Sequence, residues 1–580
     1  MRDERASARE QPHRIEPGDT RSADGPASRA PRPAFPRPPG LPASLASWLT
    51  AGLALALLLT VAPGLPAVAE RLAAPYQIDP SEGVILGETR LLLDGVDIYR
   101  PVQPEFFTAA PYPPLYYLLL APLLAAGLPP FPSARALTAA ATLLLGVLVG
   151  LLVARRTRQP AAGLLAAALW LAPNLVAVWA VRARPDLLAF TVNLLGLALV
   201  WASAGPAEQG GRGAGKTDGE EGRPHPGPLP QGGRGNRERS DEGAPAAVAA
   251  PRAQPPAPNH STPLLPRSPA PLLLAAAVLF AVGFYFKHTA LAAPAAAWLW
   301  LLLRRPRAAI IFGLAYAAAV LGPYLLLDLA SGGGFSQHLV AFHRSWSWPN
   351  YVELARPFLA AYWWLLPLPL AAAGWELARR RRPDLPAFYL AAAALVSLGG
   401  GTHGGNHNHL LETLLALALA SGAGLGRALG GRLALPALGL AAVAAVALML
   451  EPAGGRAWLA GDLRPPAASD RLGWAQIVPV VAGDPGPVYS DNVGLLLLAG
   501  HPIRYTDPFT LAGAVQAGLW SDAALVDAVR RREFSLIALR YDVGRLRGVP
   551  TDITPDLLAA IREHYVVAER NVMFLYRPRR

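Results

Sequence analysis

The stretches IDPSEG at 78–83 and YPPLYY at 112–117 belong to a polar segment, about 70–117, that separates two strongly apolar parts of the chain. This segment places carboxylates and a cluster of aromatic side chains at a membrane surface, directly after the first apolar stretch. Polar groups in such a position are costly unless they have a task. We therefore expect the chemistry of the protein to lie in this segment.

The composition is that of a polytopic membrane protein. Of the 580 residues, 52% are hydrophobic and only 16% are charged, and the mean hydropathy is +0.29. Apolar windows of about 20 residues, the length that crosses a bilayer, recur along almost the whole chain. Cysteine is absent, which excludes disulfides and thiolate metal sites.

Arginine clusters beside the apolar windows predict the orientation of the chain. Those at 155–158, 304–307 and 379–382, with Arg427, Arg432 and the N-terminal tail, should be cytoplasmic. Membrane topology thus accounts for the net charge of +12, and we expect no nucleic-acid partner. The predicted spans, about eleven, are 45–66, 135–154, 160–180, 187–203, 270–286, 289–303, 308–327, 358–377, 386–400, 409–427 and 432–450.

A further apolar run at 114–128 is treated as a short re-entrant or interfacial segment. Counted as a full crossing, it would put the arginines at 155–158 on the outer side, where positive charge is disfavoured. The N-terminus is then cytoplasmic and the region after the last span lies outside, in what we expect to be a bacterial cytoplasmic (inner) membrane.

The expected fold class is an α-helical polytopic membrane protein with a small C-terminal extracytoplasmic α/β domain. Strand-like runs occur at 488–491, 534–539 and 572–576, with amphipathic helices at 510–533 and 554–564. The predicted domains are a disordered cytoplasmic tail at 1–40, an N-terminal transmembrane part at 41–203 with a catalytic outer loop at 70–117, a disordered cytoplasmic insertion at 204–268, a C-terminal transmembrane part at 269–452 and the soluble α/β domain at 453–580.

Mixed acids, bases and hydrogen-bonding groups gather on the predicted outer side, whereas the predicted cytoplasmic side carries mainly arginine. An active or binding site needs such a mixture, whereas membrane topology needs only positive charge on one side. The outer side is therefore predicted to hold the site. Beyond the first loop, the candidate residues are Arg184, Asp186, Lys287, His288, His343, Asn408 and His409.

Lys287 is one of only two lysines, the other being Lys216 in the low-complexity insertion. A lysine at the outer end of a span, in a chain that otherwise uses arginine, favours a compact ammonium that meets a phosphate. The alternative is a lysine that reaches from the span end to the membrane interface.

Asp79 and Glu82 are three residues apart, so a helical turn would place both on one face. One carboxylate could act as a general base while the other binds or orients. The alternative is a helix N-cap, because an acidic residue or serine followed by Glu is also a capping pattern. The tyrosine of the Tyr112-Pro113-Pro114 sequence that closes the loop is not explained by capping.

Three histidines, His403, His407 and His409, lie in or just after a glycine-rich stretch at 399–405. No matching ligand motif occurs elsewhere, so hydrogen bonding to a sugar or a phosphate is the preferred interpretation and a divalent metal the weaker one. We expect no cofactor.

Taken in chain order, these features resemble the GT-C membrane glycosyltransferases, and most closely the bacterial branch related to protein O-mannosyltransferases and to the ArnT-like aminoarabinose transferase of lipid A. The resemblance rests on the acidic pair, the closing Tyr-Pro-Pro, the Arg184-Pro185-Asp186 sequence, Lys287, and Asn408-His409 before a later span. Two departures are that Pro80-Ser81 separates the acids, which leaves either as the base, and that Tyr112 stands where the aminoarabinose enzymes have a lysine.

The resemblance implies an inverting transferase with a polyprenyl-phosphate sugar donor and a lipid, polysaccharide or protein acceptor. By the same analogy Asp79 is the base, Glu82 orients it, Lys287 and Arg184 neutralise the donor phosphate, and Tyr112 contacts substrate. The alternative is a lipid or sugar transporter or flippase without transferase activity. Against it, polar residues gather at span ends and no repeat is evident. The sequence does not identify the sugar or the acceptor.

Overall fold

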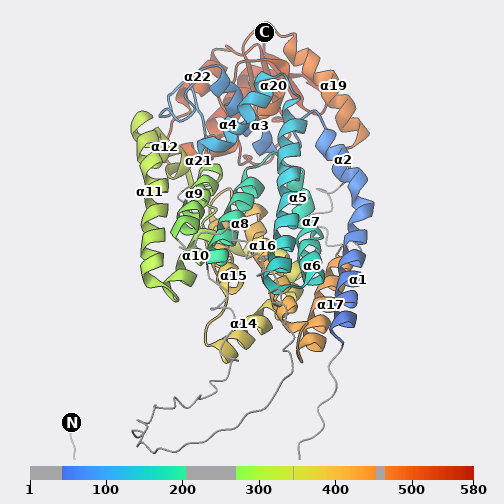
Figure 1. Ribbon diagram of the computed structural model, residues 1–580. Helices are drawn as coiled ribbons and strands as arrows, with labels where there is room; N and C mark the ends of the chain where they lie inside the picture. Colours follow the sequence, from blue (N-terminus) through green and yellow to red (C-terminus); the bar gives the residue numbers. More distant parts are fainter. Residues whose placement is uncertain (1–41, 204–269, 344, 452–463) are drawn as a thin grey trace, which may run out of the picture. The chain divides into compact units, whose positions relative to one another are not determined.

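The computed structural model describes residues 42–203, 270–343, 345–451 and 464–580, which belong to one compact unit (Figure 1). The predicted tail at 1–40 and almost all of the predicted insertion at 204–268 lie outside the described residues.

Every predicted span contains a helix, and five helical stretches are long and apolar enough to cross a membrane by themselves. They are α1 (Ala43–Val61) continuing through a short 3-10 turn into α2 (Leu65–Ala73), α5 (Pro130–Thr157), α8 (Asp186–Ser203), α11 (Pro306–Ala330), and the turn at His407–Leu410 with α16 (Leu411–Ala428). The shorter apolar helices are α4 (Pro114–Ala125), α9 (Ala270–Phe286), α10 (Ala292–Leu302), α15 (Leu385–Val396) and α17 (Ala434–Leu450). The protein is therefore a multi-pass membrane protein.

Two predicted spans are bent. Helices α6 (Pro160–Leu171) and α7 (Asn174–Ala180) meet at 68°, and α13 (Trp348–Tyr362) and α14 (Pro367–Arg380) meet at 63°. A proline lies at each break, Pro173 and Pro367, where its missing N–H cannot continue the helical hydrogen bonding. The bend at Pro173 matters for the site, because the chain that leaves α7 carries Arg182 and Arg184.

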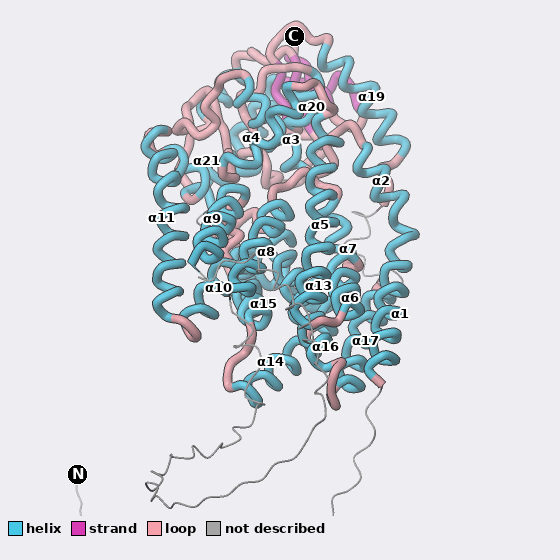
Figure 2. Tube along the Cα trace, in the orientation of Figure 1, coloured by secondary structure: helices cyan, strands magenta, loops and turns pink. Residues whose placement is uncertain are grey.

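The polar first loop is organised by α3 (Pro80–Leu93), which packs against α4. With 12 residues, α4 is about 18 Å long at 1.5 Å per residue and cannot cross a bilayer on its own. Helix α3 also packs against α20 (Val493–Ala499), and α3 and α4 lie at the end of the helical bundle where the strands are found (Figures 1 and 2).

The C-terminal part contains a four-stranded mixed sheet in the order β1-β2-β4-β3. Its strands are β1 (Val488–Ser490), β2 (Leu536–Leu539), β3 (Tyr565–Arg570) and β4 (Phe574–Pro578), with β1 parallel to β2 and the other pairs antiparallel. Three strands match predicted runs, whereas β3 was not predicted. The predicted helix at 510–533 is instead two helices, α21 (Pro508–Gln516) and α22 (Ala523–Arg530), because the chain turns at Gly518, which has a φ of 67°. Helices α19 (Ala468–Ala482) and α23 (Pro555–His564) complete this part.

The first loop and the C-terminal sheet share one apolar core. Ile85 and Leu86 of α3 belong to the same buried cluster as Val493 of α20, Leu536 of β2 and Leu575 of β4. Burial of this shared surface is the main force that holds the sheet against the loop. The position of α3, and of the residues at its N-terminus, is thus set by packing against α4 of the first loop and against the C-terminal part.

Candidate active site at the N-terminus of α3

Asp79 is the N-cap residue of α3. Its side chain accepts a hydrogen bond from the Ser81 backbone N–H at 3.0 Å, and the Glu82 side chain accepts one from the Asp79 N–H at 3.2 Å. This is a reciprocal capping box, and Pro80 at the first helical position reinforces the start of the helix. The capping interpretation of the two acids is therefore correct for the local structure, but both acids also contact residues outside the capping box.

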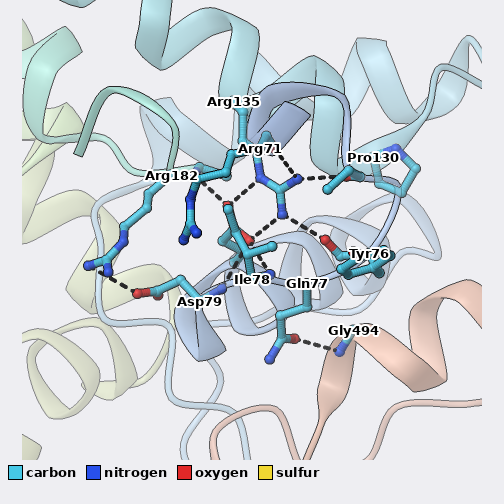
Figure 3. A network of polar contacts seen from close by, with 12 residues as sticks. Arg71, Tyr76, Gln77, Ile78, Asp79, Pro130, Arg135, Arg182 and Gly494 are labelled. Atoms are coloured by element: carbon cyan, nitrogen blue, oxygen red, sulfur yellow. Dashed lines mark hydrogen bonds and ion pairs between the residues drawn. The ribbon is translucent and has the colours of Figure 1, made fainter. Parts of the chain in front are cut away.

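Glu82 belongs to a buried network centred on Arg135 of α5 (Figure 3). The Arg135 guanidinium donates to Glu82 Oε1 at 2.8 Å and Oε2 at 2.7 Å, and to the carbonyls of Arg71, Ala74 and Tyr76 at 3.0, 2.6 and 2.7 Å. Neither the Arg135 nor the Glu82 side chain is exposed. All five donors of the fork are used, so Arg135 fixes the end of α2, the linker that follows it and the first turn of α3 together.

The remaining capacity of Glu82 is taken by backbone N–H groups. Oε2 accepts from Ile78 at 3.0 Å as well as from Asp79, and Oε1 accepts from Ala183 at 3.0 Å. One carboxylate therefore fixes the backbone of Asp79 relative to the segment that carries Arg182 and Arg184. Both Glu82 oxygens are thus occupied and its side chain has no exposed surface, whereas the Asp79 side chain is slightly exposed.

Asp79 faces two arginines that flank one indole. Arg182 Nη1 lies 3.4 Å from Asp79 Oδ2, and Arg184 Nη2 lies 3.3 Å from Oδ1. Their guanidinium carbons are 4.8 and 5.2 Å from the centre of the Trp179 ring. The segment between α7 and α8 thus presents two cations to one carboxylate.

The charge environment of Asp79 decides its protonation. Burial by itself would raise its pKa, but the attraction of Arg184 and Arg182, with the hydrogen bonds from Ser81, outweighs burial and lowers the pKa below its usual value. Asp79 is consequently a carboxylate at neutral pH, the form that can accept a proton.

Tyr112 reaches the same place from the other end of the first loop. Arg184 Nη1 lies 2.6 Å from the Tyr112 hydroxyl and hydrogen-bonds to it, and the Tyr112 carbonyl accepts a hydrogen bond from the Tyr99 hydroxyl at 2.7 Å. Burial raises the pKa of Tyr112 to about 12 although Arg184 opposes the shift, so the phenol stays protonated. Tyr112 is thereby placed beside Asp79 through a shared arginine.

A second ion pair lies where α8 begins and α9 ends. Lys287 donates to Asp186 Oδ1, which also accepts from Asn408 Nδ2 at 2.8 Å. Each charge complements the terminus at which it lies, since an acid is stabilised at a helix N-terminus and a cation at a C-terminus. Lys287, which the sequence predicts to meet a phosphate, is paired with Asp186 in the structure.

Glycine lets α8 and α9 approach closely enough for this pair to form. A Cβ at Gly283 would lie 2.1 Å from Asn193 Oδ1, and one at Gly196 would lie 2.8 Å from the Phe280 ring. The Asn193 amide also donates to the Ala290 carbonyl at 2.9 Å, just beyond Lys287. The close helix contact thus fixes Lys287 opposite Asp186.

The predicted histidines take different positions. His288 follows Lys287 and His409 follows Asn408, and both are half-buried; the side chain of His343 lies outside the described residues. His403 instead stacks on Phe509, with ring centres 4.9 Å apart. In the described part of the chain, no three His, Cys, Asp or Glu side chains are arranged to hold a metal ion.

Sequence reasoning missed the roles of Arg135 and Arg182. Arg135 was read only as the start of a span, yet a positive charge at the predicted outer end of an apolar helix is the anomaly that had singled out Lys287. Arg182 is not among the candidate residues selected from the sequence. Its partner Asp79 lies about a hundred residues earlier in the chain, so no local pattern joins them.

The site therefore combines three cations with two carboxylates, namely Arg182, Arg184 and Lys287 with Asp79 and Asp186. The Glu82–Arg135 pair beside them is neutral overall. An excess of positive charge in a largely buried setting suits an anionic ligand, and the unprotonated Asp79 supplies a base next to it.

Comparisons with known proteins bear on the fold. No family model and no curated protein matches the sequence. The structure is similar to the crystal structure of ArnT from Cupriavidus metallidurans in the apo state, with a TM-score of 0.55 and 14% identity over 90% of this chain and 97% of that chain. The structure of ArnT from the same organism bound to undecaprenyl phosphate gives the same values.

A weaker likeness, with a TM-score of 0.47 and 11% identity, extends to the Archaeoglobus fulgidus oligosaccharyltransferase in the apo form, over 92% of this chain and 74% of that chain. The likeness to ArnT confirms the predicted ArnT-like fold.

Proposed function

We propose that the protein is an integral membrane glycosyltransferase that moves a sugar from a polyprenyl-phosphate donor to a hydroxyl group of an acceptor. The observation that carries the proposal is the unprotonated, buried Asp79 held between Arg182 and Arg184. The fold supports it, because the ArnT structure with the same architecture was solved bound to undecaprenyl phosphate.

In this mechanism Asp79 removes the proton from the acceptor hydroxyl. The oxygen attacks the anomeric carbon from the face opposite the phosphate, so the new C–O bond forms as the bond to the phosphate oxygen breaks and the configuration inverts. A positioned carboxylate contributes about 10²–10⁴-fold to such a step. Glu82 contributes by fixing the backbone of Asp79 rather than by exchanging a proton.

The departing polyprenyl phosphate gains one negative charge as its bond to the sugar breaks. Arg184 and Lys287, with Arg182, are the cations proposed to neutralise it, and their worth is increased by the scarcity of water in a buried site. Tyr112, Asp186, His288, His343, Asn408 and His409 are proposed to contact the sugar or the acceptor. The acceptor class stays open among lipid, polysaccharide and protein.

The site is proposed to lie on the outer face of a bacterial cytoplasmic membrane, with the N-terminus cytoplasmic and the 453–580 domain extracytoplasmic. The support is the distribution of arginine along the chain. The test is a single cysteine at 155–158, which should be labelled by a membrane-impermeant reagent only after the cells are opened.

The activity itself is tested with purified protein, radiolabelled polyprenyl-phosphate sugars and a membrane extract as the source of acceptor. Asp79→Asn should reduce transfer by at least about 10²-fold, while the exposed Asp94→Asn on the same helix serves as the matched control and should transfer normally. Asparagine is as good an N-cap as aspartate, so the variant should fold. Full transfer by Asp79→Asn, or movement of donor lipid across the membrane by wild type without transfer, would refute the proposal.

A further inference from the structure

The two arginines at Asp79 are held differently from the arginine at Glu82. Arg135 makes five hydrogen bonds of 2.6–3.0 Å to fixed acceptors. Arg184 Nη1 donates to the Tyr112 hydroxyl at 2.6 Å, and Arg184 Nη2 donates to Asp79 Oδ1 at 3.3 Å. Arg182 Nη1 lies 3.4 Å from Asp79 Oδ2. The contacts that the two arginines make with Asp79 are thus longer than those that Arg135 makes with Glu82, so less is lost when they are exchanged for others.

The backbone beneath the two arginines is nevertheless fixed. The Ala183 N–H donates to Glu82 at 3.0 Å, and the Arg184 carbonyl accepts from the Thr138 hydroxyl at 3.3 Å. The long side chains can therefore turn about an anchored backbone. Trp179, whose ring lies beside both guanidinium groups, offers a face along which they can move without losing their cation–π contact.

The proposed reaction changes the charges on both sides of these arginines. Before transfer Asp79 carries one negative charge and the donor phosphodiester carries one. After transfer Asp79 holds the acceptor proton and is neutral, while the released polyprenyl phosphate has gained a charge. Negative charge is thus lost from one neighbour of the arginines and gained by the other.

We infer that Arg182 and Arg184 are exchangeable counter-ions, which hold Asp79 in the empty site and turn to the donor phosphate when the donor binds, so that Asp79 becomes an effective base only when the donor is present. This inference rests on the proposed function. It adds that the donor binds before the acceptor is deprotonated, and that the arginines keep Asp79 unprotonated until the donor arrives.

The electrostatics of Asp79 agree with this arrangement. Its pKa is lowered because the attraction of Arg184 and Arg182 outweighs its burial, so removing the arginines leaves burial to raise the pKa. The other charged or titratable groups nearby are Tyr112, which stays protonated, the Asp186–Lys287 pair and the Glu82–Arg135 pair. Neither pair includes the two arginines, so both remain paired when the arginines turn.

The first test measures binding of undecaprenyl phosphate to the full-length protein in detergent. Asp79→Asn removes the anion that competes for the arginines, so it should bind undecaprenyl phosphate about tenfold more tightly than wild type, the equivalent of one pKa unit, while transferring no sugar. Arg182→Gln should bind more weakly, and the exposed Arg90→Gln should bind as wild type does.

Unchanged or weaker binding by Asp79→Asn, together with lost transfer, would overturn the counter-ion exchange and leave the proposed function standing. Wild-type protein that neither binds undecaprenyl phosphate nor transfers sugar would overturn both.

The second test compares pH profiles. The acidic limb of kcat at saturating donor should lie at higher pH than the acidic limb of kcat/KM for the donor, because the first reports Asp79 after the arginines have turned and the second reports it before. Arg182→Gln should move the limb of kcat/KM upward. Coincident limbs in wild type, unaffected by Arg182→Gln, would contradict the inference.

Discussion

Two neighbouring ion-pair clusters at the start of α3 both join a carboxylate to arginine, but they differ in the length of their contacts and in their exposure. In the Glu82–Arg135 cluster each hydrogen bond to the carboxylate is 3.2 Å or shorter and neither side chain is exposed. In the Asp79–Arg182–Arg184 cluster the ion pairs are 3.3–3.4 Å long, and about a tenth of each arginine side chain is exposed. The first arrangement is closed to solvent and short-bonded, whereas the second has longer contacts and is slightly exposed.

The difference shows that spacing along a helix does not distinguish the proposed catalytic acid from a structural one. Both acids belong to one capping box. What separates them is the number and length of the contacts that donors from elsewhere in the chain make with their oxygens.

Breaking the Glu82–Arg135 cluster should have the largest effect. Arg135→Met leaves the Glu82 carboxylate buried without its ion pair, and breaking such a pair costs about 3–5 kcal/mol. The variant should unfold at a much lower temperature in detergent than wild type. Adding Glu82→Gln should recover part of the loss, because the uncompensated charge is then removed. A double variant less stable than Arg135→Met would contradict this account.

Glu88, a third carboxylate at α3, extends the comparison, because its hydrogen-bond donors are neutral groups. Glu88 Oε1 accepts from the Ala110 N–H at 2.8 Å and the Thr506 hydroxyl at 2.7 Å, and Oε2 accepts from the Tyr117 hydroxyl at 2.8 Å. With no cation among these partners, burial raises its pKa from 4.5 to about 7. Glu88 thus joins the first loop to the C-terminal part.

This shift predicts how stability depends on pH. Between pH 4.5 and 7 the folded protein holds a proton on Glu88 that the unfolded chain has released, so stability falls as pH rises through this window, by up to about 1.4 kcal/mol per pH unit. Melting temperatures of wild type should fall more steeply from pH 5 to pH 8 than those of Glu88→Gln, which resembles the protonated form. Parallel pH profiles would refute the expectation.

Capping should account for a smaller share of stability than the buried pair. Asp79→Asn keeps the N-cap but removes the charge that pairs with Arg182 and Arg184, whereas Asp79→Ala removes both. Asp79→Ala should therefore be the less stable of the two variants, by about 0.5–2 kcal/mol. Chemical or thermal unfolding of the two variants measures the difference. Loss of transfer by both variants, with this difference in stability, would separate the proposed catalytic role of Asp79 from its capping role; equal stability of the two would show that charge, not capping, stabilises this turn.

The smallest effect is expected where solvent screens the charges. Arg90 and Asp94 form an exposed i,i+4 pair at 3.2 Å on the same helix, and such pairs contribute about 0.3–0.5 kcal/mol. Arg90→Gln should change the melting temperature and transfer hardly at all. A large loss of either would mean that α3 is held by forces other than those described.

Much of the fold could be predicted because its signals are local. Apolar length located a helix within every predicted span, and strand-like runs of residues located β1, β2 and β4. The bends at Pro173 and Pro367 carried a local signal too, yet they were missed because a continuous apolar run looks the same whether the helix is straight or broken. Strand β3 was missed because its burial pattern is irregular and its residues from Val566 onward are largely exposed.

The candidate site was predicted less completely. Asp79, Arg184, Tyr112, Asp186 and Lys287 were all selected from the sequence, but their pairing was not. Lys287 pairs with Asp186, 101 residues earlier in the chain, and Glu82 pairs with Arg135, 53 residues further on.

The sequence alone determined that this chain crosses a membrane repeatedly and gathers acids, bases and aromatic side chains at span ends. Those properties follow from composition, from the length of apolar runs and from the cost of burying charge in lipid. Only the tertiary structure decided which cations pair with each acid. That outcome depends on which donors the folding of distant segments brings to each carboxylate, and Arg135 reaches Glu82 while Arg182 and Arg184 reach Asp79.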